Sequence, residues 1–141
     1  MKLFSGLATT LALITPALAD FYLYAGVTVS DSGQPEKPEA YAVSNADRGN
    51  CDGIDHSPLL DGASGDTSYP WPENDFKTRD LLCGIDLKFI RNGNDYNVYD
   101  DGAGGNQVGT CTKGNGEIKF CYWGLISAEY QEDYFCRTSV C

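Results

Sequence analysis

The sequence is poor in the residues that most catalytic and metal sites need. It contains one histidine, His56, and no pair of cysteines with C-x-x-C spacing. A mechanism that uses two histidines as acid and base is therefore excluded, and the ligand pattern of a zinc site is missing. No G-x-S-x-G nucleophile elbow occurs either. We expect neither a cofactor nor a metal, and no catalytic residue is assigned.

Basic residues are also scarce. Ten lysines and arginines stand against 20 acidic residues, which gives a formal net charge of −10 at pH 7. A field of this sign repels phosphate backbones and anionic lipid surfaces, so nucleic acids and membranes are not expected partners. No asparagine lies two positions before a serine or threonine, so we expect no N-glycan.

Long hydrophobic runs are absent, and the most apolar stretch lies at the N-terminus. Lys2 is followed by the apolar run Leu7–Ile14, then by Pro16 and the small-residue motif 17–19. This pattern predicts a signal peptide over residues 1–19, cleaved before Asp20. The run is shorter than the roughly 20 residues that span a bilayer. We therefore expect a secreted, extracellular domain, residues 20–141, with a net charge of about −11 once Lys2 is removed.

Six cysteines lie in the expected mature domain, and an even number after a signal peptide predicts three disulfides. They are Cys51, Cys83, Cys111, Cys121, Cys136 and Cys141. Cys51 stands alone in the N-terminal half, so we expect it to pair with a late cysteine and close a long loop. The spacing leaves the pairing open among 15 arrangements.

Alternating hydrophobicity predicts seven strands. In Phe21–Val29 every second residue is apolar, as in a strand with one buried face. The turn sequences 92–95 and 113–116 predict two hairpins. The other expected strands are Ala40–Val43, Ile85–Phe89, Tyr96–Tyr99, Gln107–Thr112, Glu117–Trp123 and Tyr134–Val140. The fold class is β-rich, all-β or α+β: a single small antiparallel sheet or sandwich stapled by three disulfides.

Three segments lack a clear strand pattern. Asp75–Leu82 is compatible with a short helix, and Ser127–Asp133 with either a short helix or an exposed loop. Ser44–Asp75 is rich in glycine, aspartate, asparagine, serine and proline and has no periodicity. Long segments of this kind in compact domains often carry function.

Aromatic residues are the best candidates for contacts with a partner. Trp71 stands between two prolines beside Tyr69, in the long segment without periodicity. Tyr22, Tyr24 and Tyr99 fall on the strand faces opposite the apolar ones, where exposed aromatics could contact a protein or a sugar. The alternative for Trp71 is that it folds back to cover the sheet. His56 completes the set, although a surface histidine beside acidic residues is the simpler interpretation.

Other chemistry is weakly indicated. Two of the 20 carboxylates could form a glycosidase-type pair, but the sequence nominates none. Asp95–Gly102 is rich in oxygen ligands, yet it lacks the D-x-D-x-D-G spacing and the distal glutamate of an EF-hand, which favours a solvated turn.

The chain resembles the fungal small secreted cysteine-rich proteins, many of which are candidate effectors or avirulence proteins of plant-associated fungi. Four segments carry the resemblance: Asp20–Tyr24, Tyr96–Tyr99, Val108–Cys111 and Tyr134–Ser139. The resemblance implies a compact, disulfide-bonded, β-rich or α+β fold without catalytic residues.

From this resemblance we expect a monomeric, secreted, effector-like protein that is not an enzyme. It would bind a host protein, outside host cells or after entry into them, and could be recognised by a host immune receptor. Two alternatives stay open: a cell-wall or carbohydrate-binding module that uses Trp71, Trp123 and tyrosines, and a small secreted hydrolase with an unrecognised carboxylate pair.

Overall fold

The fold is one antiparallel sheet with almost no helix, as the alternating sequence pattern predicts. The computed structural model describes residues 19–29, 35–61, 75–102 and 104–140. The elements are β1 (Ala19–Val29), β2 (Pro35–Ser44), α1 (Cys51–Asp55), β3 (Phe76–Lys77), β4 (Leu87–Asn92), β5 (Asp95–Asp100), β6 (Gln107–Lys113), β7 (Ile118–Trp123) and β8 (Ile126–Thr138). No helix in the described part of the chain is long and apolar enough to cross a membrane.

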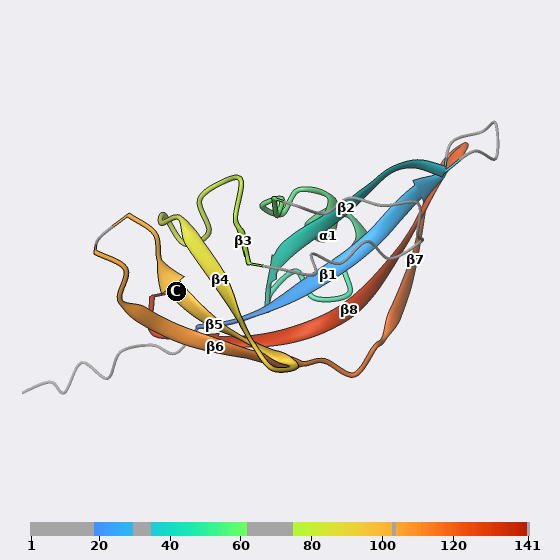
Figure 1. Ribbon diagram of the computed structural model, residues 1–141. Coiled ribbons are helices and arrows are strands. Elements are labelled where there is room, and N and C mark those ends of the chain that lie inside the picture. The colour runs from blue at the N-terminus through green and yellow to red at the C-terminus, as the bar shows by residue number, and fades with distance from the viewer. Residues whose placement is uncertain (1–18, 30–34, 62–74, 103, 141) are drawn as a thin grey trace, which may run out of the picture.

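The sheet is strongly curled (Figure 1), and the segment Leu59–Asp61 bridges its two end strands. Its strand order is β2-β1-β8-β6-β5-β4-β3, and every pairing is antiparallel. Leu59 bridges to Tyr41 of β2, and the next residue, Leu60, bridges to Thr78 just after β3. The Leu60 N–H also donates to the Ala40 carbonyl at 2.8 Å. The segment around Leu59 therefore covers the edges of β2 and β3, which would otherwise present unpaired backbone groups.

β8 organises the long end of the sheet. One of its edges pairs with β1 along almost its whole length, while the other pairs first with β7 and then with β6. Leu23 lies opposite Tyr134 and Tyr24 opposite Glu132, so Asp133 is an extra residue that forms a β-bulge. β7 extends the sheet beyond β6 and pairs with β8 alone.

The main core fills the inside of the curled sheet. Aromatic rings dominate it: Phe76 stacks on Phe89 with centroids 4.6 Å apart, and Phe21 meets Phe89 edge-on at 6.2 Å. Leu23, Leu87 and Val98 belong to the same buried cluster, as does the disulfide pair Cys111–Cys136. Burying each large side chain stabilises the fold by about 1.5–3 kcal/mol relative to its exposure.

A second core lies on the outer face of the sheet under α1. Tyr22, Tyr24 and Tyr41 pack there with Tyr130 of β8 and Ile54 of α1. The disulfide Cys51–Cys121 fixes α1 to β7, as expected for a bridge between Cys51 and a late cysteine. Cys83 is disulfide-bonded too, and no described cysteine is reduced; Cys141 lies outside the described residues.

Three expectations about local structure need correction. The turn sequence 113–116 does not join β6 and β7 as a hairpin, because both strands pair with β8, one after the other along the same edge. Asp75–Leu82 forms no helix: it holds the two-residue strand β3 and two isolated bridges, because Phe76 and Leu82 are buried in the sheet's main core. Ser127–Asp133 is neither helix nor loop but the first part of β8, where β1 and β7 supply backbone partners on both sides. The only described helix, α1, has five residues.

Candidate functional site

The aromatic contact residues expected from the sequence do not form one surface. Tyr69 and Trp71 lie outside the described residues. Tyr22 and Tyr24 are on the predicted face, but the expectation that they are exposed is wrong, because α1 and the preceding turn cover that face. Tyr99 is half-buried on β5. The sheet therefore has apolar residues on both faces, whereas alternation alone implies one wet face.

His56 is exposed and serves the local backbone. It follows α1 directly, its N–H donates to the Asp52 carbonyl, and its Nδ1 lies 2.7 Å from the same oxygen. This is a helix-terminating contact, since the last carbonyls of a helix lack partners within the helix.

A buried carboxylate lies at the centre of the outer face. Glu132 is 1% exposed and accepts hydrogen bonds from Arg48 Nε at 2.9 Å, Arg48 Nη2 at 3.3 Å and the Tyr24 hydroxyl at 3.0 Å. Arg48 also covers the Tyr22 ring, with its guanidinium carbon 4.3 Å from the centroid. Burial, followed by the charge of Glu132, raises the pKa of Tyr24. These hydrogen bonds fix Arg48 over the sheet.

The neighbouring carboxylate has no such partner. Asp133 is the bulge residue, and its Oδ2 atom is buried without a hydrogen bond. Desolvation raises its pKa to about 6, opposed by the positive charge of Lys113. Glu132, its neighbour along the chain, is engaged by Arg48, so the two carboxylates do not form the acid and nucleophile pair of a glycosidase.

The described residues hold no group of three histidine, cysteine, aspartate or glutamate side chains that could bind a metal ion. A small, half-open concavity of about 240 Å³ lies on β6 and β8, lined by Thr110, Thr112, Phe135 and Arg137. Arg137 lies over the Phe135 ring at 5.3 Å, which leaves little room above the ring for a ligand. This concavity is small and half-open, and we regard it as a minor feature of the surface.

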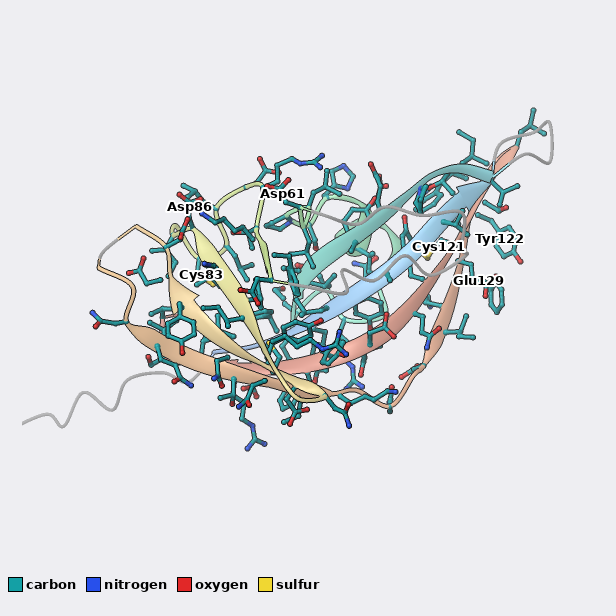
Figure 2. The ribbon with its side chains drawn as sticks, viewed as in Figure 1. Asp61, Cys83, Asp86, Cys121, Tyr122 and Glu129 are labelled. Atoms are coloured by element: carbon teal, nitrogen blue, oxygen red, sulfur yellow. A yellow bond between two sulfur atoms is a disulfide. The ribbon has the colours of Figure 1, made fainter. Side chains whose placement is uncertain are left out.

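Exposed apolar side chains gather on β7 and the turn that follows it. Six large hydrophobic residues are exposed in the described chain, and five belong to this hairpin. We call these five the β7 surface: Ile118, Phe120, Tyr122, Leu125 and Ile126. Tyr122 is 75% exposed and Leu125 73%. Figure 2 shows Tyr122 pointing away from the body of the molecule, near Glu129. Clustered exposed apolar residues mark an interaction site, whereas scattered ones do not.

The opposite face of β7 explains why this one is exposed. Cys121 is buried and bonded to Cys51, and the Trp123 indole N–H donates to Asp52 of α1 at 3.0 Å. α1 therefore covers the Cys121 side of the strand, and the alternate residues point to the other side. The sequence places Ile118, Phe120 and Tyr122 on one strand face, but it does not say which face is covered.

The described residues place one exposed apolar cluster on β7 and the turn after it. An apolar strand is bonded covalently to a helix on one side and is open on the other, and the buried carboxylates nearby are either paired or enclosed. Comparisons with family models, curated proteins and solved structures found no significant match for this chain.

Proposed function

We propose that this protein is a secreted, effector-like protein that acts by non-catalytic binding to a host protein through the β7 surface. The observation that carries the proposal is the concentration of five of six exposed large hydrophobic residues on one hairpin. Exposed Phe and Tyr side chains in such a patch are typical anchors of protein interfaces.

The energetic argument favours a protein partner. Covering a large apolar side chain is worth about 1.5–3 kcal/mol and association costs about 4–15 kcal/mol, so measurable affinity requires most of the five exposed residues to be covered together. The surface is held by the hairpin and by the Cys51–Cys121 disulfide, so little order must be gained on binding. The step from a protein partner to a host protein, and from there to avirulence, rests on the resemblance to fungal secreted cysteine-rich proteins.

A second candidate is binding to a cell-wall polysaccharide. Phe120 and Tyr122 are exposed aromatics at alternate positions of one strand, and aromatic rings can pack against the apolar faces of sugar rings. The exposed aliphatic residues Ile118, Leu125 and Ile126 favour the protein partner, because sugar rings pack on flat aromatic side chains and not on branched aliphatic ones.

The test is a binding assay with the oxidised domain of residues 20–141 against host extract and insoluble chitin or glucan in parallel. Phe120→Thr and Tyr122→Thr remove the anchors with a residue that strands tolerate. Leu81→Thr is the matched control, since Leu81 is 56% exposed and lies outside the hairpin.

Retention of a discrete host protein by the wild type and the Leu81 variant, with loss in both hairpin variants, supports the proposal. Sedimentation with the polysaccharide, without retention of a host protein, supports binding to a cell-wall polysaccharide instead. Turnover of a substrate with no hairpin-dependent binding refutes both.

A further inference from the structure

We infer that β7 is a docking strand: it accepts an extended, basic peptide segment of the partner protein, which adds to the sheet as an antiparallel strand. This inference rests on the proposed function and names the partner's chemistry. Strand addition of this kind draws affinity from backbone hydrogen bonds and specificity from alternate side chains.

The backbone of β7 has the required edge. Glu132 donates its N–H to the Glu117 carbonyl at 2.9 Å, and its own carbonyl accepts from the Gly116 N–H at 3.1 Å, so residue 132 turns its backbone groups toward β7. In an antiparallel pair this direction alternates along the strand. Tyr130 and Ala128, opposite Lys119 and Cys121, therefore also bond across to β7.

The residues between these pairs face outward. By the same alternation, Ile118, Phe120 and Tyr122 turn their N–H and C=O groups away from β8, toward the open edge. Cys51 Sγ lies 3.7 Å from the Phe120 carbonyl oxygen, so α1 borders this edge at Phe120. That sulfur is in a disulfide and has no proton to donate. The residues with outward backbone groups are thus the residues with exposed apolar side chains.

The other two sheet edges are covered in part, at Ala40–Ala42 of β2 and at the end of β3. Leu59 and Leu60 bridge β2 and the end of β3, as described above. The Asp61 N–H donates to the Lys77 carbonyl of β3 at 2.8 Å. An uncovered edge strand is an aggregation hazard that proteins normally protect. Among the described residues β7 has a strand partner on one side alone, which is the arrangement that a strand-accepting site requires.

Charge selects the occupant. Glu117 directly precedes β7; its side chain is 65% exposed and lies 3.9 Å from Arg48 Nη2. Glu129 lies opposite Phe120, on the Phe120 face of the strand. Asp52 and Asp55 of α1 are exposed beside the other face of β7. Lys119 is the one cation within the strand. A second copy of this chain has a net charge of −10 and would be repelled by these acidic side chains. A segment that alternates apolar and basic residues would instead place its apolar side chains over the exposed apolar face of β7 and its basic side chains near the acidic residues on the other face.

The probe is a synthetic peptide of alternating lysine and valine, about eight residues long, enough to pair with all of β7. In an antiparallel strand whose valines lie over Ile118, Phe120 and Tyr122, the valine N–H groups point toward β7 and the lysine N–H groups point away. Two isomers, N-methylated on the valines or on the lysines, have the same charge and side chains. They differ in which edge can donate hydrogen bonds.

We expect the unmethylated and lysine-methylated peptides to bind the oxidised domain in fluorescence anisotropy, and the valine-methylated peptide to bind roughly tenfold or more weakly. Phe120→Thr and Tyr122→Thr should weaken binding of the first two, while Leu81→Thr should not. A glutamate–valine peptide should bind more weakly than the lysine–valine one, and raised salt should reduce the difference.

Equal binding of the two methylated isomers overturns the added strand, as does the absence of binding by the lysine–valine peptide. Sedimentation showing a dimer that Tyr122→Thr dissolves assigns the edge to a second copy instead. The proposed function fails separately: capture of a host protein that depends on Phe120 and Tyr122, with indistinguishable isomers, leaves that function standing and removes only strand addition.

Discussion

Two adjacent carboxylates on β8 show how strongly a single residue's surroundings decide its role. Glu132 is buried but satisfied by Arg48 and Tyr24, whereas Asp133 is enclosed at the bulge with Oδ2 unpartnered. Neither state follows from the sequence, where the two are simply neighbouring acids. Their partners, Arg48 and Tyr24, are 84 and 108 positions away from Glu132, so only the folded sheet brings these groups together.

Asp133 should make the protein less stable as the pH rises. Its pKa is raised from 3.8 to about 6 by desolvation, so the folded state holds the proton more tightly than the unfolded state between these values. The free energy of unfolding therefore falls as pH rises from about 4 to 6, and the loss persists above that window. Asp133→Asn should remove this part of the slope and be more stable than the wild type at pH 7. Urea unfolding at intervals from pH 4 to 8 measures the difference.

Glu132→Gln is the control for this experiment, because it alters a buried carboxylate that is already paired and should be destabilising at neutral pH. An Asp133→Asn profile parallel to that of the wild type would show that the bulge carboxylate is solvated after all.

At the level of elements, the sequence pattern found β1 and β4 to β7 with end errors of up to three residues, because β1, β4, β5 and β7 alternate apolar and polar residues and β6 precedes the turn sequence 113–116. It failed for the first half of β8. Glu129, Gln131, Glu132 and Asp133 look like a solvated segment, yet β1 and β7 enclose them as a central strand. It also missed α1, whose five residues include a glycine and depend on the disulfide rather than on helix propensity.

The candidate site was half visible at this level. The sequence shows that Ile118, Phe120 and Tyr122 alternate onto one face of the strand. Predicting which face is buried also requires knowing what packs on each face. Here α1, bonded to β7 through Cys51, covers the Cys121 face of the strand. Nothing in the local sequence pattern of β7 reveals that contact.

Removing the Cys51–Cys121 disulfide should therefore affect both α1 and the β7 surface. The two residues are 70 positions apart, so closing this loop contributes about 4 kcal/mol on the chain-entropy model. Cys51→Ala with Cys121→Ala should lower the free energy of unfolding by that order and abolish amide protection in α1. It should also weaken binding of the lysine–valine peptide.

Cys111→Ala with Cys136→Ala is the matched control, because that disulfide joins β6 to β8 in the main core and does not touch α1. It should lower stability but leave α1 protected in hydrogen exchange. Equal loss of protection in both double variants would mean that α1 is held by the sheet as a whole.

On the scale of the whole molecule, the decisive feature is closure of the sheet by a segment that looked structureless. Ser44–Asp75 has no periodicity, yet its Leu59–Asp61 part joins the two ends of an eight-stranded sheet. Closure depends on few residues, of which Leu60 is the most buried, at 2% exposed. Within the described residues β7 pairs with β8 alone, and the proposed strand docking rests on that arrangement.

Leu60→Ala should accordingly open the sheet as well as create a cavity. We expect a loss of roughly 2–5 kcal/mol in the free energy of unfolding from the lost packing. Because the edges of β2 and β3 would then be uncovered, the variant should also aggregate at concentrations at which the wild type stays monomeric. Leu125→Ala makes the same chemical change at a site 73% exposed and should change stability by no more than about 0.5 kcal/mol. Urea unfolding with sedimentation velocity separates the two effects: a Leu60 variant that is destabilised yet strictly monomeric would show that Leu60 fills the core without guarding the edges.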